Sequence, residues 1–242
     1  MGRAAGNGTL PALDRVARKR EGIHGERSQS AGGRLRPQRK GAALVSMSFR
    51  EYRYLVRSDL YRISDRVDSR TLFKHVTRGS AFKFNFWMRT CRYTKGSPLL
   101  NYFFYQPFAR RMFIHYTYKF GISIPFETQI GSGFYIGHFG GIVVNEECVI
   151  GKNCNISHGV TLGVVNRGER QGCPTIGDNV YIGPGAKVVG RINVGNFAAI
   201  GANSVVTKDV PDYGVVVGIP GRVISEEGST GYVNRTDYEG KI

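Results

Sequence analysis

From residue 124 to residue 206 the apolar residues recur at every sixth position, a spacing that belongs neither to an amphipathic helix nor to an ordinary strand. In most of these repeats a glycine follows the apolar residue directly, and a small residue often stands four positions after it. This pattern predicts a parallel β-helix, in which each hexad forms a short strand and a turn and three hexads close one coil. The predicted core positions are Ile124, Ile130, Ile136, Ile142, Ile150, Ile156, Leu162, Ile176, Ile182, Val188, Val194, Ile200 and Val206.

The repeat is interrupted at two places, and both predict loops. The step from Ile142 to Ile150 is eight residues, and the step from Leu162 to Ile176 is 14 residues, which leaves an eight-residue loop within residues 164–175. Because a regular coil accepts extra residues at its corners, we expect both insertions there. Loops that leave a rigid scaffold often carry function, so the longer one is a candidate site.

The sequence before the repeat divides into two segments. Apolar residues at near-helical spacing between charged ones predict one or more amphipathic helices in a cap of residues 47–120. Residues 1–46 have no aromatic residue and no helical or strand period, so we expect them to be disordered. We also expect Met47 to be the natural start, the alternative being a basic tail for anionic partners. The β-helix is expected over residues 121–224, followed by a C-terminal tail of residues 225–242.

The charge of the chain is strongly uneven. Lys and Arg number 34 against 18 Asp and Glu, a net charge of +16, and residues 1–46 hold ten basic and three acidic residues, which is +7 of that total. A basic chain favours nucleic acid or an anionic membrane surface as partner. Residues 1–46 lack the interleaved aromatic residues that stack on bases, so we expect no nucleic-acid partner.

A second basic segment lies in the predicted cap. Residues 69–126 contain ten Lys and Arg and no Asp or Glu, and 14 of the 28 aromatic residues lie between Phe82 and Phe120. Two interpretations follow: the aromatic residues pack on the next domain and on neighbouring subunits, or residues 82–120 dock on an anionic membrane face. The longest charge-free aromatic run, residues 97–109, has 13 residues and is too short to span a bilayer. Four cysteines without C-x-x-C spacing favour a cytoplasmic protein with reduced thiols, with any membrane docking at the inner face.

Several segments carry a family resemblance. Residues 182–210, IGPGAKVVGRINVGNFAAIGANSVVTKDV, resemble the signature of hexapeptide-repeat acyltransferases. The segments GHFGGIVVNEECVIGKNCNISHGVTLG and VVVGIPGRVI look like the serine acetyltransferase branch and its bacterial polysaccharide O-acetyltransferase relatives. The resemblance covers about half of the chain and implies acetyl-CoA as donor and homotrimers with active sites between neighbouring subunits. It also implies the fold class, an all-β solenoid that is a left-handed parallel β-helix with a small N-terminal α-helical cap.

Two histidines in the repeat are candidates for the chemistry. Acetylation of a hydroxyl by a thioester requires a base, and histidine is the side chain that titrates nearest to neutral pH. His138 stands two positions after Ile136 and His158 two positions after Ile156, and the 20 residues between them are one coil of 18 plus the two-residue insertion. We therefore expect both imidazoles at one corner, about 4.8 Å apart along the stacking direction.

The resemblance implies a role for the first of these histidines. His138 falls in GHFGGIVV, where the family places its catalytic histidine, which makes it the expected general base. His158 has three open roles: it orients the acceptor, it forms a hydrogen bond with His138, or it caps the corner. The group that orients the His138 ring also stays open between a backbone carbonyl and Glu127, Glu146 or Glu147.

Further binding residues follow from the same resemblance. The residues expected to line the acetyl-CoA groove are Gly183, Gly185, Ala186, Gly201 and Ala202. The residues expected to meet its phosphates are Lys187, Lys208 and Arg222. Arg167 and Arg170 in the long loop are candidates for acceptor binding, particularly of an acidic acceptor. No metal is expected, because a zinc enzyme of the carbonic anhydrase kind needs three converging histidines and the repeat has two.

The sequence departs from the family at the residues that hold serine. Gly137 stands where the family has an aspartate, Ser123 aligns with a second acid, and Gly172 and Cys173 replace an Arg-His pair. Groups for the carboxylate and ammonium of serine are therefore missing from these positions. We expect an O-acetyltransferase that acts on a sugar hydroxyl in polysaccharide or glycoconjugate biosynthesis. The alternative is serine O-acetylation for cysteine biosynthesis.

Overall fold

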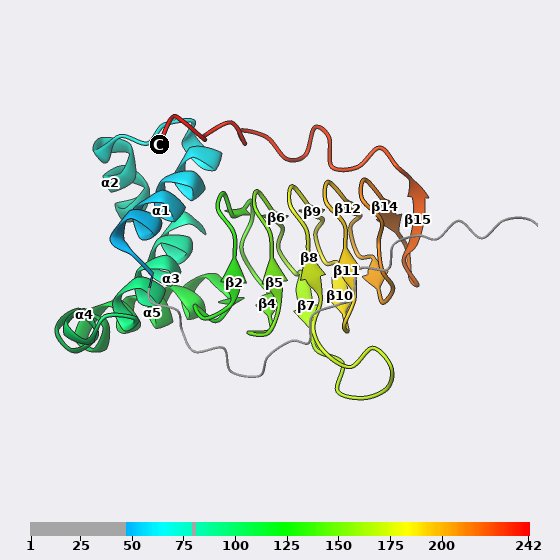
Figure 1. The fold of residues 1–242 in the computed structure, drawn as a ribbon, viewed down its shortest axis with the longest axis horizontal. Coiled ribbons are helices and arrows are strands. Elements are labelled where there is room, and N and C mark those ends of the chain that lie inside the picture. The colour runs from blue at the N-terminus through cyan, green and yellow to red at the C-terminus, as the bar shows by residue number, and fades with distance from the viewer. Residues whose placement is uncertain (1–46, 79–80) are drawn as a thin grey trace, which may run out of the picture. The chain divides into compact units, whose positions relative to one another are not determined.

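The computed structural model describes residues 47–78 and 81–242, and the expectations for residues 1–46 lie outside them. A helical domain, blue to green in Figure 1, precedes a stack of β coils, green to orange. The helices are α1 (Phe49–Ser64), α2 (Ser69–Thr77), α3 (Ala81–Lys95), α4 (Pro98–Leu100), the π-helix η1 (Asn101–Ala109) and α5 (Arg110–Phe120). No helix among the described residues is both long and apolar enough to cross a bilayer.

Local polar groups define where the helices begin and end. The Ser48 hydroxyl accepts a hydrogen bond from the Glu51 N–H at 3.1 Å, and Asp68 accepts one from the Thr71 N–H at 3.0 Å, so both side chains satisfy first-turn donors. α5 ends at Gly121, whose φ of 60° is left-handed. This turn leads the chain directly into the first strand.

The β coils follow the predicted six-residue period. The strands are β1 (Ile122–Ser123), β2 (Gln129–Ile130), β3 (Tyr135–Ile136), β4 (Ile142–Val144), β5 (Val149–Ile150), β6 (Asn155–Ile156), β7 (Thr161–Gly163), β8 (Thr175–Ile176), β9 (Tyr181–Ile182), β10 (Lys187–Val189), β11 (Asn193–Val194), β12 (Ala199–Ile200), β13 (Val205–Val206), β14 (Val215–Val217) and β15 (Arg222–Ser225). They form three sheets, with the orders β1-β4-β7-β10-β13, β2-β5-β8-β11 and β3-β6-β9-β12-β14-β15. Among the described strands, every pairing is parallel except that of β14 with β15, which closes the last coil. The prediction of a parallel β coil is confirmed.

The core of the coils is the column of predicted apolar positions, all of which are buried. The register stacks them directly, since Ile136 lies opposite Ile156 and Ile156 opposite Ile182. The glycine that follows each of several core residues permits close stacking. A Cβ on Gly151 would lie 2.6 Å from the carbonyl carbon and oxygen of Gly177 in the next coil, closer than side-chain atoms come.

Buried charged side chains join the helical domain to the first coil. Arg89 of α3 pairs with Asp59 of α1 at 3.0 Å and donates to the carbonyls of Ile130 and Gly131 at 2.7 Å each. Asp59 in turn accepts a hydrogen bond from the Phe134 N–H at 2.8 Å. The first coil has no preceding coil to pair with, so these groups satisfy backbone atoms that would otherwise be buried without partners.

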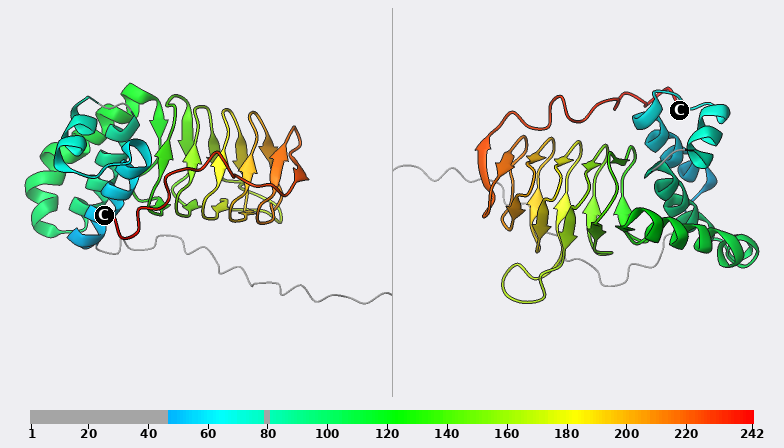
Figure 2. Two further views of the ribbon diagram at one scale, coloured as in Figure 1. Left: turned by 90° about the horizontal axis from the view of Figure 1, so that it is seen from above. Right: turned by 180° about the vertical axis from the view of Figure 1, so that it is seen from behind.

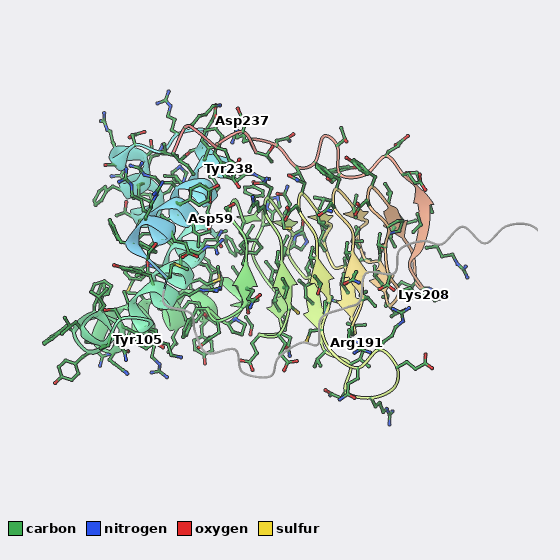
Figure 3. All side chains as sticks on the ribbon, in the orientation of Figure 1. Asp59, Tyr105, Arg191, Lys208, Asp237 and Tyr238 are labelled. Carbon is green, nitrogen blue, oxygen red and sulfur yellow. The ribbon has the colours of Figure 1, made fainter. Side chains whose placement is uncertain are left out.

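The C-terminal segment, residues 226–242, returns along the coils to the helical domain, as the red trace in Figures 1 and 2 shows. The Ser229 N–H donates to the Phe197 carbonyl at 2.8 Å, and the Tyr232 ring stacks on Tyr181 with centroids 4.5 Å apart. Tyr238, labelled in Figure 3 beside the helical domain, is buried. Its hydroxyl donates to the Asn153 side chain at 2.8 Å, which fixes the segment at its far end.

Candidate active site at a coil corner

The two repeat histidines lie at the same corner of consecutive coils, where the chain turns from β3 to β4 and from β6 to β7. The pairing of Ile136 with Ile156 sets this position, because each histidine follows its partner strand by two residues. The ring centroids are 6.1 Å apart and the ring planes are at 78°. The sequence therefore placed the pair correctly at one corner, where the rings meet edge to face.

Both imidazoles are available to a substrate. His138 and His158 are exposed, and within residues 47–78 and 81–242 neither ring forms a hydrogen bond. Of the acids considered for orienting the first ring, Glu127 is held by Lys95 at 2.9 Å instead. The ring nitrogens are therefore free to contact a ligand or a second subunit.

Aromatic side chains flank the exposed corner. The ring of Phe139 packs on Phe120 with centroids 4.7 Å apart, which fixes the residue next to His138. Gly137 is exposed, and the Tyr135 ring lies 3.3 Å from the point where a Cβ on this glycine would stand. Sequence reasoning missed Tyr135 and Phe139. The only available signal was that each is an aromatic residue within three positions of His138.

Lys187, one of the expected phosphate ligands, is half-buried. Its ammonium donates to the Gly159 carbonyl at 2.5 Å and to the Thr161 hydroxyl at 3.1 Å. These contacts hold the turn that carries His158. The phosphate role expected of Lys187 stays a prediction, as do those of Lys208, labelled at the edge of the coils in Figure 3, and Arg222, both of which are exposed.

The predicted groove residues differ in accessibility. Gly183 and Ala186 are buried, Gly185 and Gly201 are half-buried, and Ala202 is exposed. Gly183 also faces the next coil closely, since a Cβ there would lie 2.9 Å from the Ala202 nitrogen. These residues lie at the corner that carries the histidines, one to three coils further along the stack.

The long loop leaves the coils after β7 and returns before β8. Its base is closed by backbone hydrogen bonds between Val165 and Gly172, at 2.9 Å and 3.0 Å. Arg170 forms an ion pair with Asp209 at 3.4 Å, so it ties the loop to its own coils, whereas Arg167 is exposed at the loop tip. Of the two loop arginines, the structure leaves Arg167 as the one available to an acceptor.

Two hollows lie on the coils, but neither contains the histidines. One, of about 430 Å³, lies beside the long loop and is lined by Val143, Leu162 and Val164 among others. The other, of about 680 Å³, lies between β9, β12 and the C-terminal segment, and Gly201 is the predicted groove residue that lines it. Both imidazoles at the histidine corner are nonetheless exposed on the single chain. No group of three or more metal-ligating side chains occurs among the described residues.

Several known proteins are similar to this chain. The family model described as bacterial transferase hexapeptide (six repeats) matches residues 173–208. The serine acetyltransferase of Bacillus pumilus (strain SAFR-032) is 49% identical over 108 residues, which are 45% of this chain and 50% of that protein. The chain therefore spans about half the length of the curated relatives that it matches.

Solved structures extend the similarity over most of the chain. The serine acetyltransferase of Brucella abortus strain S19 in complex with coenzyme A has a TM-score of 0.60 at 32% identity and covers 74% of this chain and 70% of its own. The serine acetyltransferase of Neisseria gonorrhoeae in complex with serine has a TM-score of 0.59 at 29% identity, covering 73% and 70%. From this extent and identity, together with the hexad coils, the chain belongs to the hexapeptide-repeat serine acetyltransferase family.

Proposed function

We propose that the protein is an acetyl-CoA-dependent O-acetyltransferase in which His138 is the general base. The observation that carries the proposal is the exposed pair of imidazoles at one coil corner, in a chain of this family. Because both rings are exposed, they do not pack in the apolar core of the coils. Imidazole is suited to accept a proton from a hydroxyl near neutral pH.

The proposed step transfers one proton and one acetyl group. His138 takes the proton from the acceptor hydroxyl while that oxygen attacks the thioester carbonyl carbon. The carbon–sulfur bond then breaks, and the imidazolium returns the proton to the departing thiolate, so that CoA and the acetyl ester are the products. His158 lies one coil further, with its ring centroid 6.1 Å from that of His138, and we assign to it the orientation of the acceptor. The coenzyme A complex of the Brucella abortus relative supports acetyl-CoA as the donor.

L-Serine is the acceptor that the comparisons support. Relatives named serine acetyltransferase and a relative solved with serine favour it, whereas nothing in the comparisons supports the sugar hydroxyl expected from the sequence. Since Gly137 and Gly172 carry no side chain for the ends of serine, other groups must hold them. Arg167 is the exposed cation on the loop and is proposed to meet the carboxylate. The homotrimer and the left-handed coil that the resemblance implies belong to the same proposal.

Thiol release from acetyl-CoA tests the proposal. We expect serine-dependent release by the full chain and a loss of about 10²–10⁴-fold in kcat for His138→Ala, the usual contribution of a general base. His115→Ala is the matched control, because His115 is exposed on α5, outside this corner. Unchanged turnover in His138→Ala would exclude it as the base.

The acceptor is decided in the same assay. L-Serine is compared with a panel of nucleotide sugars and oligosaccharides at equal concentration. Release that depends on serine and falls in Arg167→Ala supports the proposed acceptor. Release with a sugar alone would show that Gly137 and Gly172 exclude the amino acid.

A further inference from the structure

The outermost part of the helical domain presents aromatic side chains to solvent. We call residues 99–111, which run from α4 through η1 into α5, the aromatic tip. Tyr102 is 73% exposed and Phe103 71% exposed, values that are exceptional for residues of this type. The exposed large apolar residues of the tip are Leu99, Tyr102, Phe103, Phe104 and Phe108.

Other aromatic residues of the same helical domain are buried. The sequence left two interpretations open for the aromatic residues of 82–120, packing and membrane docking, and packing explains the buried ones. The buried aromatic side chains between residues 82 and 120 are Phe82, Phe84, Trp87, Tyr105 and Phe120. They account for the packing of the helical domain on itself and on the coils. Tyr102 and Phe103 contact each other, with ring centroids 5.0 Å apart, and neither belongs to these buried clusters, so their exposure needs another explanation.

The geometry of η1 separates the two sets. Tyr105 and Ala109 are buried against Trp87 and Cys91, which anchors the π-helix on α3. Phe108 contacts the Trp87 ring edge-on at 5.4 Å, whereas Tyr102 and Phe103 are the most exposed aromatic residues of η1. Figures 1 and 2 both show α4 and η1 at the end of the helical domain that lies away from the coils, and Figure 3 labels Tyr105 there. The tip is therefore remote from the histidine corner.

The surroundings of the tip are positively charged. Residues 69–126 contain no Asp or Glu. Arg110 and Arg111 are exposed directly after η1, and Lys119 is exposed in the last turn of α5. The next acid along the chain, Glu127, is already paired with a lysine at 2.9 Å. A surface that exposes Tyr and Phe beside Arg and Lys, without acidic residues, is suited to bind at the interface of an anionic bilayer.

We propose that the aromatic tip docks the protein on an anionic membrane surface. Tyr102 and Phe103 enter the headgroup boundary, and Arg110 and Arg111 meet lipid phosphates. A symmetric contact between the tips of two copies is disfavoured, because it would bring the arginines of both tips together and residues 99–111 contain no acid to offset them. The proposal is independent of the acetyl-transfer chemistry, since no residue of the tip contacts the histidine corner.

Vesicle sedimentation of the full chain tests this surface. The probes are vesicles of equal parts phosphatidylcholine and phosphatidylglycerol, and vesicles of phosphatidylcholine alone. We expect binding to the mixed vesicles and a loss of about tenfold or more in partitioning for the Tyr102→Ser/Phe103→Ser double variant, because each ring loses its apolar burial. The control is Phe49→Ser/Phe73→Ser, whose side chains are 62% and 70% exposed on α1 and α2.

Fluorescence gives a second readout. The chain has one tryptophan, Trp87, and its ring lies edge-on to Phe108 of the tip at 5.4 Å. Its emission should change when mixed vesicles are added to the wild-type chain and stay constant for the double variant.

Two results would overturn the proposal. If the double variant binds mixed vesicles as tightly as the wild-type chain, another basic segment, such as residues 1–46, carries the binding. If the wild-type chain ignores both vesicles while the double variant changes the mass measured by light scattering, the tip is an interface between copies.

Discussion

Replacing Arg89 by methionine should remove much of the stability of the joint between the helical domain and the first coil. The guanidinium lies 3.0 Å from the Asp59 carboxylate and also donates to the Ile130 and Gly131 carbonyls at 2.7 Å each. Both charged side chains are almost fully buried, with exposures of 2% and 1%. Methionine keeps most of the aliphatic volume but leaves a carboxylate and two carbonyls without their partner.

The expected cost follows from the carboxylate left behind. Removing one member of a buried ion pair typically costs about 3–5 kcal/mol, far more than an exposed pair at about 0–1 kcal/mol. The Asp59→Asn/Arg89→Met double variant should recover part of this loss. The amide still accepts the Phe134 N–H, which now contacts the carboxylate at 2.8 Å, but no uncompensated charge remains.

Urea unfolding followed by circular dichroism measures the free energies of the wild-type chain, both single variants and the double variant. A loss below about 1 kcal/mol for Arg89→Met, the range of an exposed pair, would refute the reasoning. So would a double variant that is less stable than either single variant, because the penalty would then not arise from an unpaired charge.

Three further changes have outcomes fixed by local geometry. Gly151→Ala should destabilise the coils by about 1–3 kcal/mol, because its Cβ would lie 2.6 Å from backbone atoms of the next coil. Gly163→Ala should destabilise them less, because its Cβ would lie 3.2 Å from a valine methyl, and equal melting temperatures of the two variants would contradict this. Burial raises the pKa of Cys91 and Cys154 to about 12, so both thiols should react about a thousandfold more slowly with Ellman's reagent than a free thiol, and fast modification of the folded chain would argue against it. Burial also raises the pKa of Tyr238 to about 12, so its stabilising contribution is complete below pH about 10 and is lost as pH rises towards 12; the unfolding free energy of Tyr238→Phe should lack this alkaline decrease.

The coils could be predicted from the sequence because the pattern that specifies them repeats within a few residues. Each core position repeats the same environment six residues later, so a single rule places all of them, from Ile124 to Val206. The histidine corner follows from the same arithmetic, since a separation of one coil plus a two-residue insertion puts His138 and His158 at equivalent turns.

The parts that the sequence did not reveal depend on contacts between distant residues. Tyr238 is buried against Ser132, 106 positions earlier, and no periodic pattern near residue 238 indicates this. The π-helical winding of η1 likewise has no signature in a search for helical or strand periods. The hydrogen bond from the Lys187 ammonium to the Gly159 carbonyl, at 2.5 Å, likewise joins residues 28 positions apart, and no local pattern indicates it.

Because the C-terminal segment returns along the coils, its length depends on the number of coils in the stack. The segment leaves β15 at the last coil and is anchored by Tyr238 against Ser132 and Asn153 of the first two coils, so it spans the coils between them. Adding one coil would move its two attachment points apart by about 4.8 Å, more than the reach of one extended residue at about 3.3–3.6 Å. A relative with one extra coil and the same anchor therefore needs about two more residues in this segment. The number of coils and the length of the C-terminal segment must change together.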